Sequence, residues 1–341
     1  MKAFLKLIGS TATLLFVTLT AVAHHTSSIY DHGRSVTLHG TVTKFAWTNP
    51  HVHVEIAMTN DAGESVSWVI EGLAPAAMTR VGWSRQTLVP AEQVIISGHP
   101  ARNPGSRMIL GGSVVKGDGT RLIIPSLREG SSPPVDLPTP IAADSLSGIW
   151  VTRWNPEIAS KFLQAKTPLM LTDKGVAAMR NYDTSMDPGS NCIPEPIPYV
   201  MIFPAGKRLE IGEELTTIRD EIGTERSVYM NVDSHDGASF EIHGHSIGWW
   251  EGDVLVVDTT HFIDHRRGLA LWGLASGSEK HLVERFELNS DRTVINYTFV
   301  LEDPEYLAEP ITETLALVHR PDISFVNEPC DFESAHRYLD G

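Results

Sequence analysis

The chain has 341 residues, of which 42% are hydrophobic and 20% are charged, so it is long enough to form more than one hydrophobic core. Its 42 acidic and 27 basic residues give a formal net charge of -15 at pH 7. An acidic chain without clusters of basic residues is poorly suited to bind nucleic acid or an anionic membrane surface, so we expect neither as a partner.

The first 23 residues have the pattern of a secretory signal peptide. Lys2 and Lys6 form a basic start, residues 14–22 are mostly apolar, and Ala21-Val22-Ala23 is a small-x-small cleavage site. No later stretch approaches the roughly 18 apolar residues that a membrane helix needs. We therefore expect cleavage after Ala23 and a periplasmic or secreted protein without a transmembrane segment, whose oligomeric state the sequence does not define.

Residues 24–125 are predicted to form a small β domain. Five segments between residues 36 and 124 are rich in β-branched and aromatic residues and are separated by turns. A short helix is predicted over residues 75–81. Five strands and one helix within about 90 residues favour a small barrel of the OB type.

Several short motifs of this segment together support a resemblance to one family. They are Ala23-His24-His25, Gly40-Thr41-Val42, Trp47-Thr48-Asn49-Pro50-His51, Trp68, Glu71, Gly82-Trp83 and Gly98. In these motifs the segment resembles a family of small exported bacterial domains of unknown function. The resemblance implies a domain boundary and an exported location, and it implies no activity.

Four histidines of the same segment are candidate ligands for copper or zinc. Cleavage after Ala23 would make His24 the N-terminal residue, next to His25, and would offer a metal both an amine and an imidazole. His51 and His53 lie on one face of a predicted strand. The alternative interpretation is a mobile terminus beside a solvated polar strand face.

The second half of the chain is predicted to form a larger barrel. Residues 126–144 are rich in Pro and Ser and predict a semi-rigid linker, and residues 145–341 form the second domain. Eight or nine predicted strands with short turns favour an antiparallel, lipocalin-like barrel that encloses one small ligand. The expected fold class is therefore mainly β, with two barrels. Cys192 and Cys330 are expected to form a disulfide in an oxidising compartment, with a catalytic thiol as the alternative.

Two motifs of this half carry resemblances. Gly148-Ile149-Trp150 is similar to the first strand of lipocalin-like barrels. The stretch Gly244-His245-Ser246-Ile247-Gly248-x-Trp250-Glu251-Gly252-Asp253, with further pieces up to Cys330, resembles an uncharacterised module of exported bacterial proteins. Neither resemblance implies an activity.

The sharpest chemical pattern lies in residues 241–262. Two strand-forming runs flank Glu251-Gly252, which we expect to be a two-residue hairpin loop that places His245 opposite Asp258. Because side chains alternate along a strand, one face of the hairpin holds one set of residues. The members of that face are His243, His245, Ile247, Trp249, Val254, Val256, Asp258 and Thr260.

This face predicts acid–base chemistry if it lines the barrel. His245 would be the general base, Asp258 would orient it, and His243 or a tyrosine would polarise the substrate. The predicted ligand contacts are Ile247, Trp249, Val254, Val256, Tyr199 and Tyr297.

The predicted function is a cofactor-independent isomerase, hydratase or lyase acting on a small, partly apolar molecule. The alternatives are a purely structural His–Asp pair, a non-catalytic carrier or sensor of a small apolar ligand, and copper or zinc binding through the N-terminal histidines.

Overall fold

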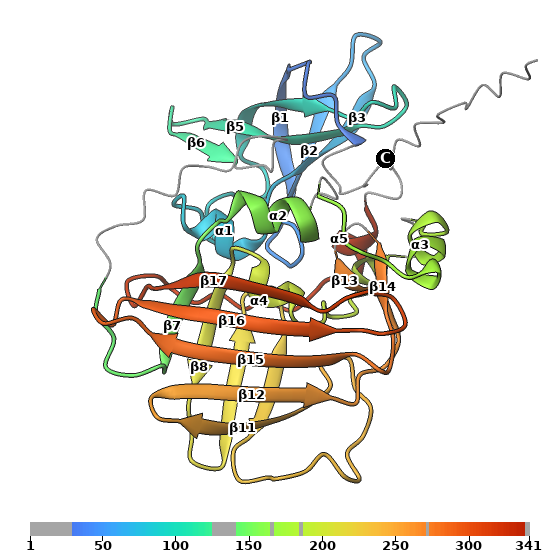
Figure 1. Ribbon diagram of the computed structural model, residues 1–341. Helices are drawn as coiled ribbons and strands as arrows, with labels where there is room; N and C mark the ends of the chain where they lie inside the picture. Colours follow the sequence, from blue (N-terminus) through green and yellow to red (C-terminus); the bar gives the residue numbers. More distant parts are fainter. Residues whose placement is uncertain (1–28, 125–140, 164–166, 184–186, 271–272, 338–341) are drawn as a thin grey trace, which may run out of the picture.

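A computed structural model describes residues 29–124, 141–163, 167–183, 187–270 and 273–337 (Figure 1). Over these ranges the chain is mainly β and forms two barrels, which confirms the predicted fold class. The predicted signal peptide, His24, His25 and most of the predicted linker lie outside the described residues. No helix within the described ranges is both long and apolar enough to cross a membrane.

The N-terminal barrel has the strand order of an OB fold. Five strands close in the order β1-β2-β3-β5-β4, with β3 and β5 parallel and the other pairs antiparallel, and a sixth strand, β6, extends β5. Helix α1 (Pro75–Thr79) lies between β3 and β4 in the chain. The strands are β1 (Val36–Ala46), β2 (His53–Thr59), β3 (Ser65–Glu71), β4 (Gln93–Pro100), β5 (Met108–Lys116) and β6 (Arg121–Ile124).

Alternate side chains along each strand form the hydrophobic core of this barrel. In β4, Val94 and Ile96 are buried while Ile95 faces outward, and the core they join includes Trp83. Gly112 in β5 has a φ of +102°, and a Cβ at this position would stand 1.8 Å from the carbonyl oxygen of Ser97. Only glycine therefore allows β5 to approach β4 this closely.

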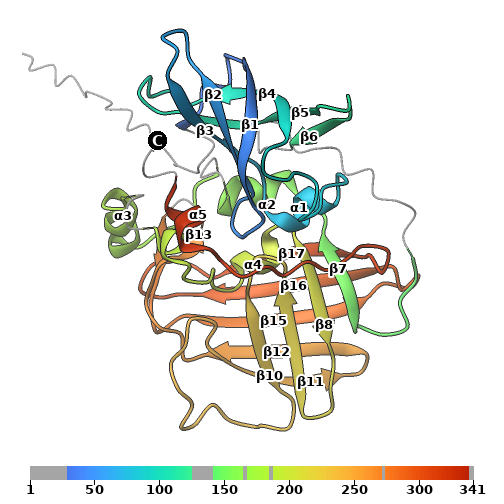
Figure 2. The same ribbon diagram turned by 180° about the vertical axis from the view of Figure 1, so that it is seen from behind.

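The C-terminal half forms a closed barrel of nine strands in the order β10-β11-β12-β15-β16-β17-β7-β8-β9 (Figures 1 and 2). Ala143, at the end of the predicted linker, exchanges hydrogen bonds of 2.8 Å with Arg292 and so packs on this barrel. The strands are β7 (Gly148–Thr152), β8 (Gly206–Glu210), β9 (Leu215–Asp220), β10 (Glu225–Tyr229), β11 (His245–Glu251), β12 (Val254–Thr260), β15 (His281–Leu288), β16 (Val294–Glu302) and β17 (Ile311–His319).

Short elements decorate the large barrel. They are α2 (Pro156–Phe162), α3 (Asp173–Arg180), the 3-10 helix η3 (Pro188–Asn191), α4 (Tyr199–Ile202) and the two-stranded ribbon of β13 (His265–Ala270) and β14 (Leu274–Ser276). At the start of α3, the hydroxyl of the N-cap residue Thr172 accepts a hydrogen bond from the Gly175 N–H.

One pairing departs from the predicted antiparallel barrel. Val228 and Tyr229 of β10 pair in parallel with Ser246 and Ile247 of β11. Parallel neighbours need a crossover connection, and residues 230–244 form it. Strand alternation in the sequence groups residues by face and carries no information on strand direction, so this pairing could not be predicted from the pattern.

The predicted β11–β12 hairpin forms, but in a different register. Glu251 pairs with Val254, so Gly252 and Asp253 form the loop, and His245 lies opposite Thr260 instead of Asp258. Gly252, with a φ of +63°, takes the first loop position, as type II′ turns prefer. The prediction was wrong because it placed this glycine at the second loop position.

The hairpin face that carries His245 and Asp258 points out of the barrel. The register change moves each cross-strand partner by two residues. Because side chains alternate with a period of two, every residue stays on its predicted face. Leu255 and Val257, on the opposite face, belong to the buried core together with Phe286 and Phe299. The prediction that the barrel interior is lined by Ile247, Trp249, Val254 and Val256 is therefore wrong, because their face points outward. Both faces of this hairpin contain apolar residues, so the pattern alone could not distinguish inside from outside.

Side chains fill the interior of the large barrel. Arg226 forms a buried ion pair with Glu284 (Nη1–Oε1 3.0 Å) and donates to Thr259 (2.8 Å), and Tyr297 donates to Glu284 (2.8 Å). A cavity beside Arg226 has a volume of about 10 Å³, which is room for one water molecule. We expected this barrel to enclose a small ligand. In the described residues its interior is instead filled by packed side chains.

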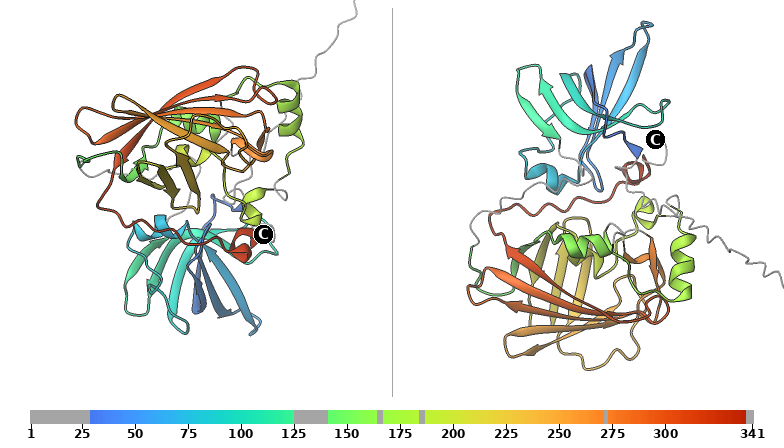
Figure 3. Two further views of the ribbon diagram at one scale, coloured as in Figure 1. Left: turned by 90° about the horizontal axis from the view of Figure 1, so that it is seen from below. Right: turned by 45° about the horizontal axis from the view of Figure 1, so that its top comes forward.

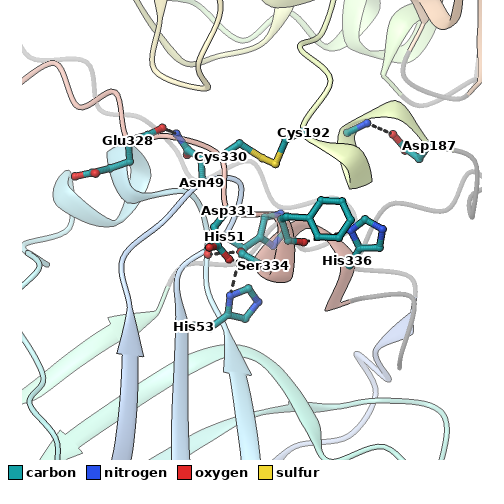
Figure 4. The surroundings of a disulfide bond; sticks show 12 residues. Asn49, His51, His53, Asp187, Cys192, Glu328, Cys330, Asp331, Ser334 and His336 are labelled. Atoms are coloured by element: carbon teal, nitrogen blue, oxygen red, sulfur yellow. Dashed lines mark hydrogen bonds between the residues drawn. A yellow bond between two sulfur atoms is a disulfide. The ribbon is translucent and has the colours of Figure 1, made fainter.

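The end of the chain returns to the small barrel. Figure 3 shows the dark-red C-terminal segment running between the two barrels. Asn49, after β1, pairs with Cys330, since its N–H donates to Pro329 O (3.3 Å) and its carbonyl accepts from Asp331 N–H (2.8 Å). Cys330 forms the predicted disulfide with Cys192, next to η3, so no free thiol remains (Figure 4). Helix α5 (Phe332–His336) follows.

Candidate functional site

His245 and Asp258 lie on the outer wall of the large barrel and are joined by a third residue, His235. The Nδ1 atom of His235 is 2.8 Å from Nδ1 of His245, and its Nε2 is 2.9 Å from Oδ1 of Asp258. His235 belongs to the crossover segment 230–244, whose sequence gave no sign of this role. The predicted pair is therefore brought together indirectly.

The polar chain continues beyond Asp258. Its second oxygen accepts from Nε2 of His281 (2.7 Å), whose Nδ1 faces Glu302 (3.3 Å). Partial burial alone would raise the pKa of Asp258, but His281 and His235 lower it below its ordinary value. The hydrogen bond to Asp258 in turn raises the pKa of His281. Asp258 thus stays ionised between two imidazoles.

The remaining predicted residues do not join this cluster. His243 is half-buried, and burial lowers its pKa to about 4. Tyr297 lies in the barrel core, and Tyr199 lies on α4 against Phe203. The predicted ligand contacts are therefore divided between the outer wall, the core and a helix, and they form no common pocket in the described residues.

A second cluster lies where the small barrel meets the C-terminal segment. Glu71, at the end of β3, is buried, accepts a hydrogen bond from the Tyr30 hydroxyl (2.8 Å) and pairs with Nδ1 of His51. Burial would lower the pKa of His51, but the Glu71 carboxylate raises it above its ordinary value. Although burial favours the protonated acid, His51 lowers the pKa of Glu71 to about 2. The Nε2 atom of His51 is the ring nitrogen that this contact leaves available.

His53 is the most buried histidine of this cluster. His53 begins β2, where it pairs with Glu71 of β3. The ring centroids of His53 and His51 are 6.4 Å apart. Figure 4 shows the two rings beside Ser334. Nδ1 of His53 is 3.2 Å from the Ser334 hydroxyl, whereas its buried Nε2 has no hydrogen-bond partner among the described residues. Burial lowers the pKa of His53 to about 4, so the ring is neutral at pH 7. An unpaired nitrogen in such a place requires an explanation.

The structure thus places two of the four predicted metal ligands side by side. His24 and His25 lie outside the described residues. Among the described side chains, no group of three or more His, Cys, Asp or Glu residues is arranged to hold a metal ion. His51 and His53 would therefore need additional ligands.

Sequence reasoning missed Tyr30, Ser334 and His235. Ser334 is more than 280 positions from the histidines it contacts, and only the return of the C-terminal segment brings it near. Tyr30 and His235 sit outside any strand pattern. Glu71 was noticed as part of a motif, and the structure gives it a physical role as the partner of His51.

Comparison with known proteins finds one family, and it covers only the N-terminal part of the chain. Residues 12–110 match the model of a family of unknown function, DUF6152, and this range contains Tyr30, His51, His53 and Glu71. No curated protein and no solved structure matches the chain. The N-terminal part is therefore similar to a domain family of unknown function.

Proposed function

We propose that this is an exported protein that binds one copper or zinc ion where the small barrel meets the C-terminal segment. The observation that carries the proposal is the buried, unpartnered Nε2 of His53 beside a second imidazole, His51. Metal-binding histidines typically donate their other ring N–H to a carboxylate or another oxygen. Glu71 and Ser334 have this role for His51 and His53.

His24 and His25 are the proposed additional ligands. Tyr30, whose hydroxyl contacts Glu71, is six residues from His24, and six residues span up to about 20 Å. After cleavage at Ala23, His24 would add an amine and an imidazole to the two ring nitrogens. An all-nitrogen set of this kind suits copper or zinc.

Export is part of the same proposal. The Cys192–Cys330 disulfide supports an oxidising location, in keeping with the predicted signal peptide. The finer identification of residues 145–336 with an exported module also remains a proposal. The nine-stranded barrel gives it general support and identifies no ligand.

Titration of the full, processed chain with Cu²⁺ and Zn²⁺, together with elemental analysis, tests the proposal. We expect one ion per chain, and a loss of affinity of about 100-fold or more in His51→Gln and His53→Gln, since each removes a ligand. An added residue before His24 should also weaken binding. His281→Gln, on the outer wall, is the matched control and should bind as the wild type does. A processed chain that takes up neither metal would rule the proposal out.

A second candidate function is acid–base catalysis on the outer wall, favoured by the chain of groups from Glu302 to His245. His245 would act as the base, with Asp258 acting on it through His235. Tyr229, stacked at 5.1 Å on His245, and the exposed Trp249 offer apolar contacts for a small, partly apolar substrate. An isomerase, hydratase or lyase reaction would fit such a site, and it would need no cofactor.

Exchange of α-protons of small ketones in D₂O, followed by NMR, tests for this activity. We expect exchange to be abolished in His245→Gln and Asp258→Asn and kept in His51→Gln. Equal exchange with wild type and His245→Gln would remove this candidate. The carrier alternative has less support, because the cavity of about 10 Å³ inside the barrel holds no organic ligand.

A further inference from the structure

Ser334 reaches the small barrel from the opposite end of the chain. It lies in α5, where its N–H donates to the capping Asp331 carboxylate (2.8 Å). The residue before Asp331 is Cys330, which is bound to Cys192 of the C-terminal half and paired with Asn49 of the small barrel (Figure 4). A covalent bond, a backbone bridge and a helix cap therefore fix the place of one hydroxyl group.

The hydrogen bonds of this hydroxyl determine the state of His53. A serine hydroxyl has one proton, and Ser334 donates it to the carbonyl oxygen of His51 (2.9 Å). Nδ1 of His53, at 3.2 Å, must then be the donor to Ser334. The proton of the neutral His53 ring is thus on Nδ1, and the lone pair is on the buried Nε2.

We infer that Ser334 is a positioning residue of the metal site, so that the C-terminal segment completes a site that the small barrel does not complete alone. This inference rests on the proposed metal binding. By holding the His53 proton on Nδ1, Ser334 keeps Nε2 ready to coordinate, and through the His51 carbonyl it also fixes the residue that carries the second ligand. Outer partners of this kind contribute about 10- to 100-fold to metal affinity.

Cu²⁺ affinity of the full chain, measured by competition with a chelator, tests the inference. Ser334→Ala should weaken binding about tenfold or more, whereas Ser334→Thr, which keeps the hydroxyl, should restore it. The electron paramagnetic resonance spectrum of bound Cu²⁺ should show one fewer imidazole nitrogen in Ser334→Ala, an effect that a merely structural role would not produce. Ser239→Ala, in the exposed part of segment 230–244, is the matched control.

A double-mutant cycle identifies the route of the effect. In a His53→Gln background, Ser334→Ala should cause no further loss of affinity, because Ser334 acts through His53. Replacing both Cys192 and Cys330 by Ser frees the segment from its covalent bond and should weaken binding in the same direction. Wild-type affinity and an unchanged spectrum in Ser334→Ala would overturn the inference alone, whereas a wild-type chain without metal would overturn the proposed function as well.

Discussion

The His51–His53 pair of the small barrel and the outer-wall cluster of the large barrel hold their histidines in different ways. In the small barrel, Nδ1 of His51 and Nδ1 of His53 are each held by the protein, and among the described residues the buried Nε2 of His53 has no hydrogen-bond partner. On the large barrel, His235 and His281 use both ring nitrogens within one chain of hydrogen bonds. Held but incompletely paired imidazoles indicate a place for a ligand, whereas fully paired ones indicate structure or proton transfer.

The largest effect is expected in the core of the large barrel. Arg226→Met leaves Glu284 buried without its cation, so we expect a loss of about 3–5 kcal/mol in the free energy of unfolding. Urea denaturation measures it. The double variant Arg226→Met with Glu284→Leu should regain most of the loss. A mild effect of the single variant would mean that water reaches this interior and that it is less packed than described.

Acid should destabilise the metal-free chain through His53. The pKa of His53 is about 4 in the folded chain, compared with an ordinary value of 6.5. The contribution of His53 to the free energy of unfolding is therefore complete above pH 6.5 and is lost as the pH falls towards 4. This pKa difference corresponds to a loss of about 3 kcal/mol in the free energy of unfolding.

Urea denaturation at several pH values, with a chelator present, measures this loss. His53→Gln should remove the contribution of His53 and leave those of His243 and His265, whose pKa values burial also lowers to about 4. Identical pH profiles for the wild type and His53→Gln would show that His53 is less buried in solution.

The outer-wall chain should contribute less to stability. His235→Ala removes one partner from Asp258 and one from His245, at a cost of about 1 kcal/mol. The exposed segment around His235 would also lose these two side-chain contacts with the wall, so limited proteolysis should cleave it faster. Ser239→Ala serves as the control, and unchanged cleavage of His235→Ala would contradict the contacts described.

The smallest effect is expected at an exposed ion pair on the large barrel. Arg219 contacts Glu225 (2.9 Å), and both side chains face solvent. Glu225→Gln should change the free energy of unfolding by about 0.5 kcal/mol or less. A loss as large as that of Arg226→Met would show that surface charge stabilises this barrel as much as its interior does.

The sequence was sufficient to predict the β class, a small OB-type first barrel, a large second barrel and the Cys192–Cys330 disulfide. These features depend on local alternation, turn residues and cysteine content. The hairpin register was missed by two residues, because Gly252 fits either loop position. The inward face was missed because both faces of the hairpin contain apolar residues.

The candidate site was only partly predictable. His51 and His53 were recognised because they are two residues apart on one strand. Ser334 was not, because nothing in its own surroundings reports that residues 323–337 return to the N-terminal barrel. Contacts of such long sequence separation depend on the path of the whole chain, which the local pattern does not contain.

The returning C-terminal segment also affects how the gene can be divided. A fragment that ends near residue 124, at the boundary that sequence patterns predict, would encode the small barrel without the strand-like partner of Asn49 and without the hydroxyl beside His53. Such a fragment would expose backbone groups and an imidazole that the full chain covers. The small barrel therefore depends on residues near 330 as well as on residues 29–124. A gene fusion that replaced the second half of the chain would have to keep that C-terminal segment.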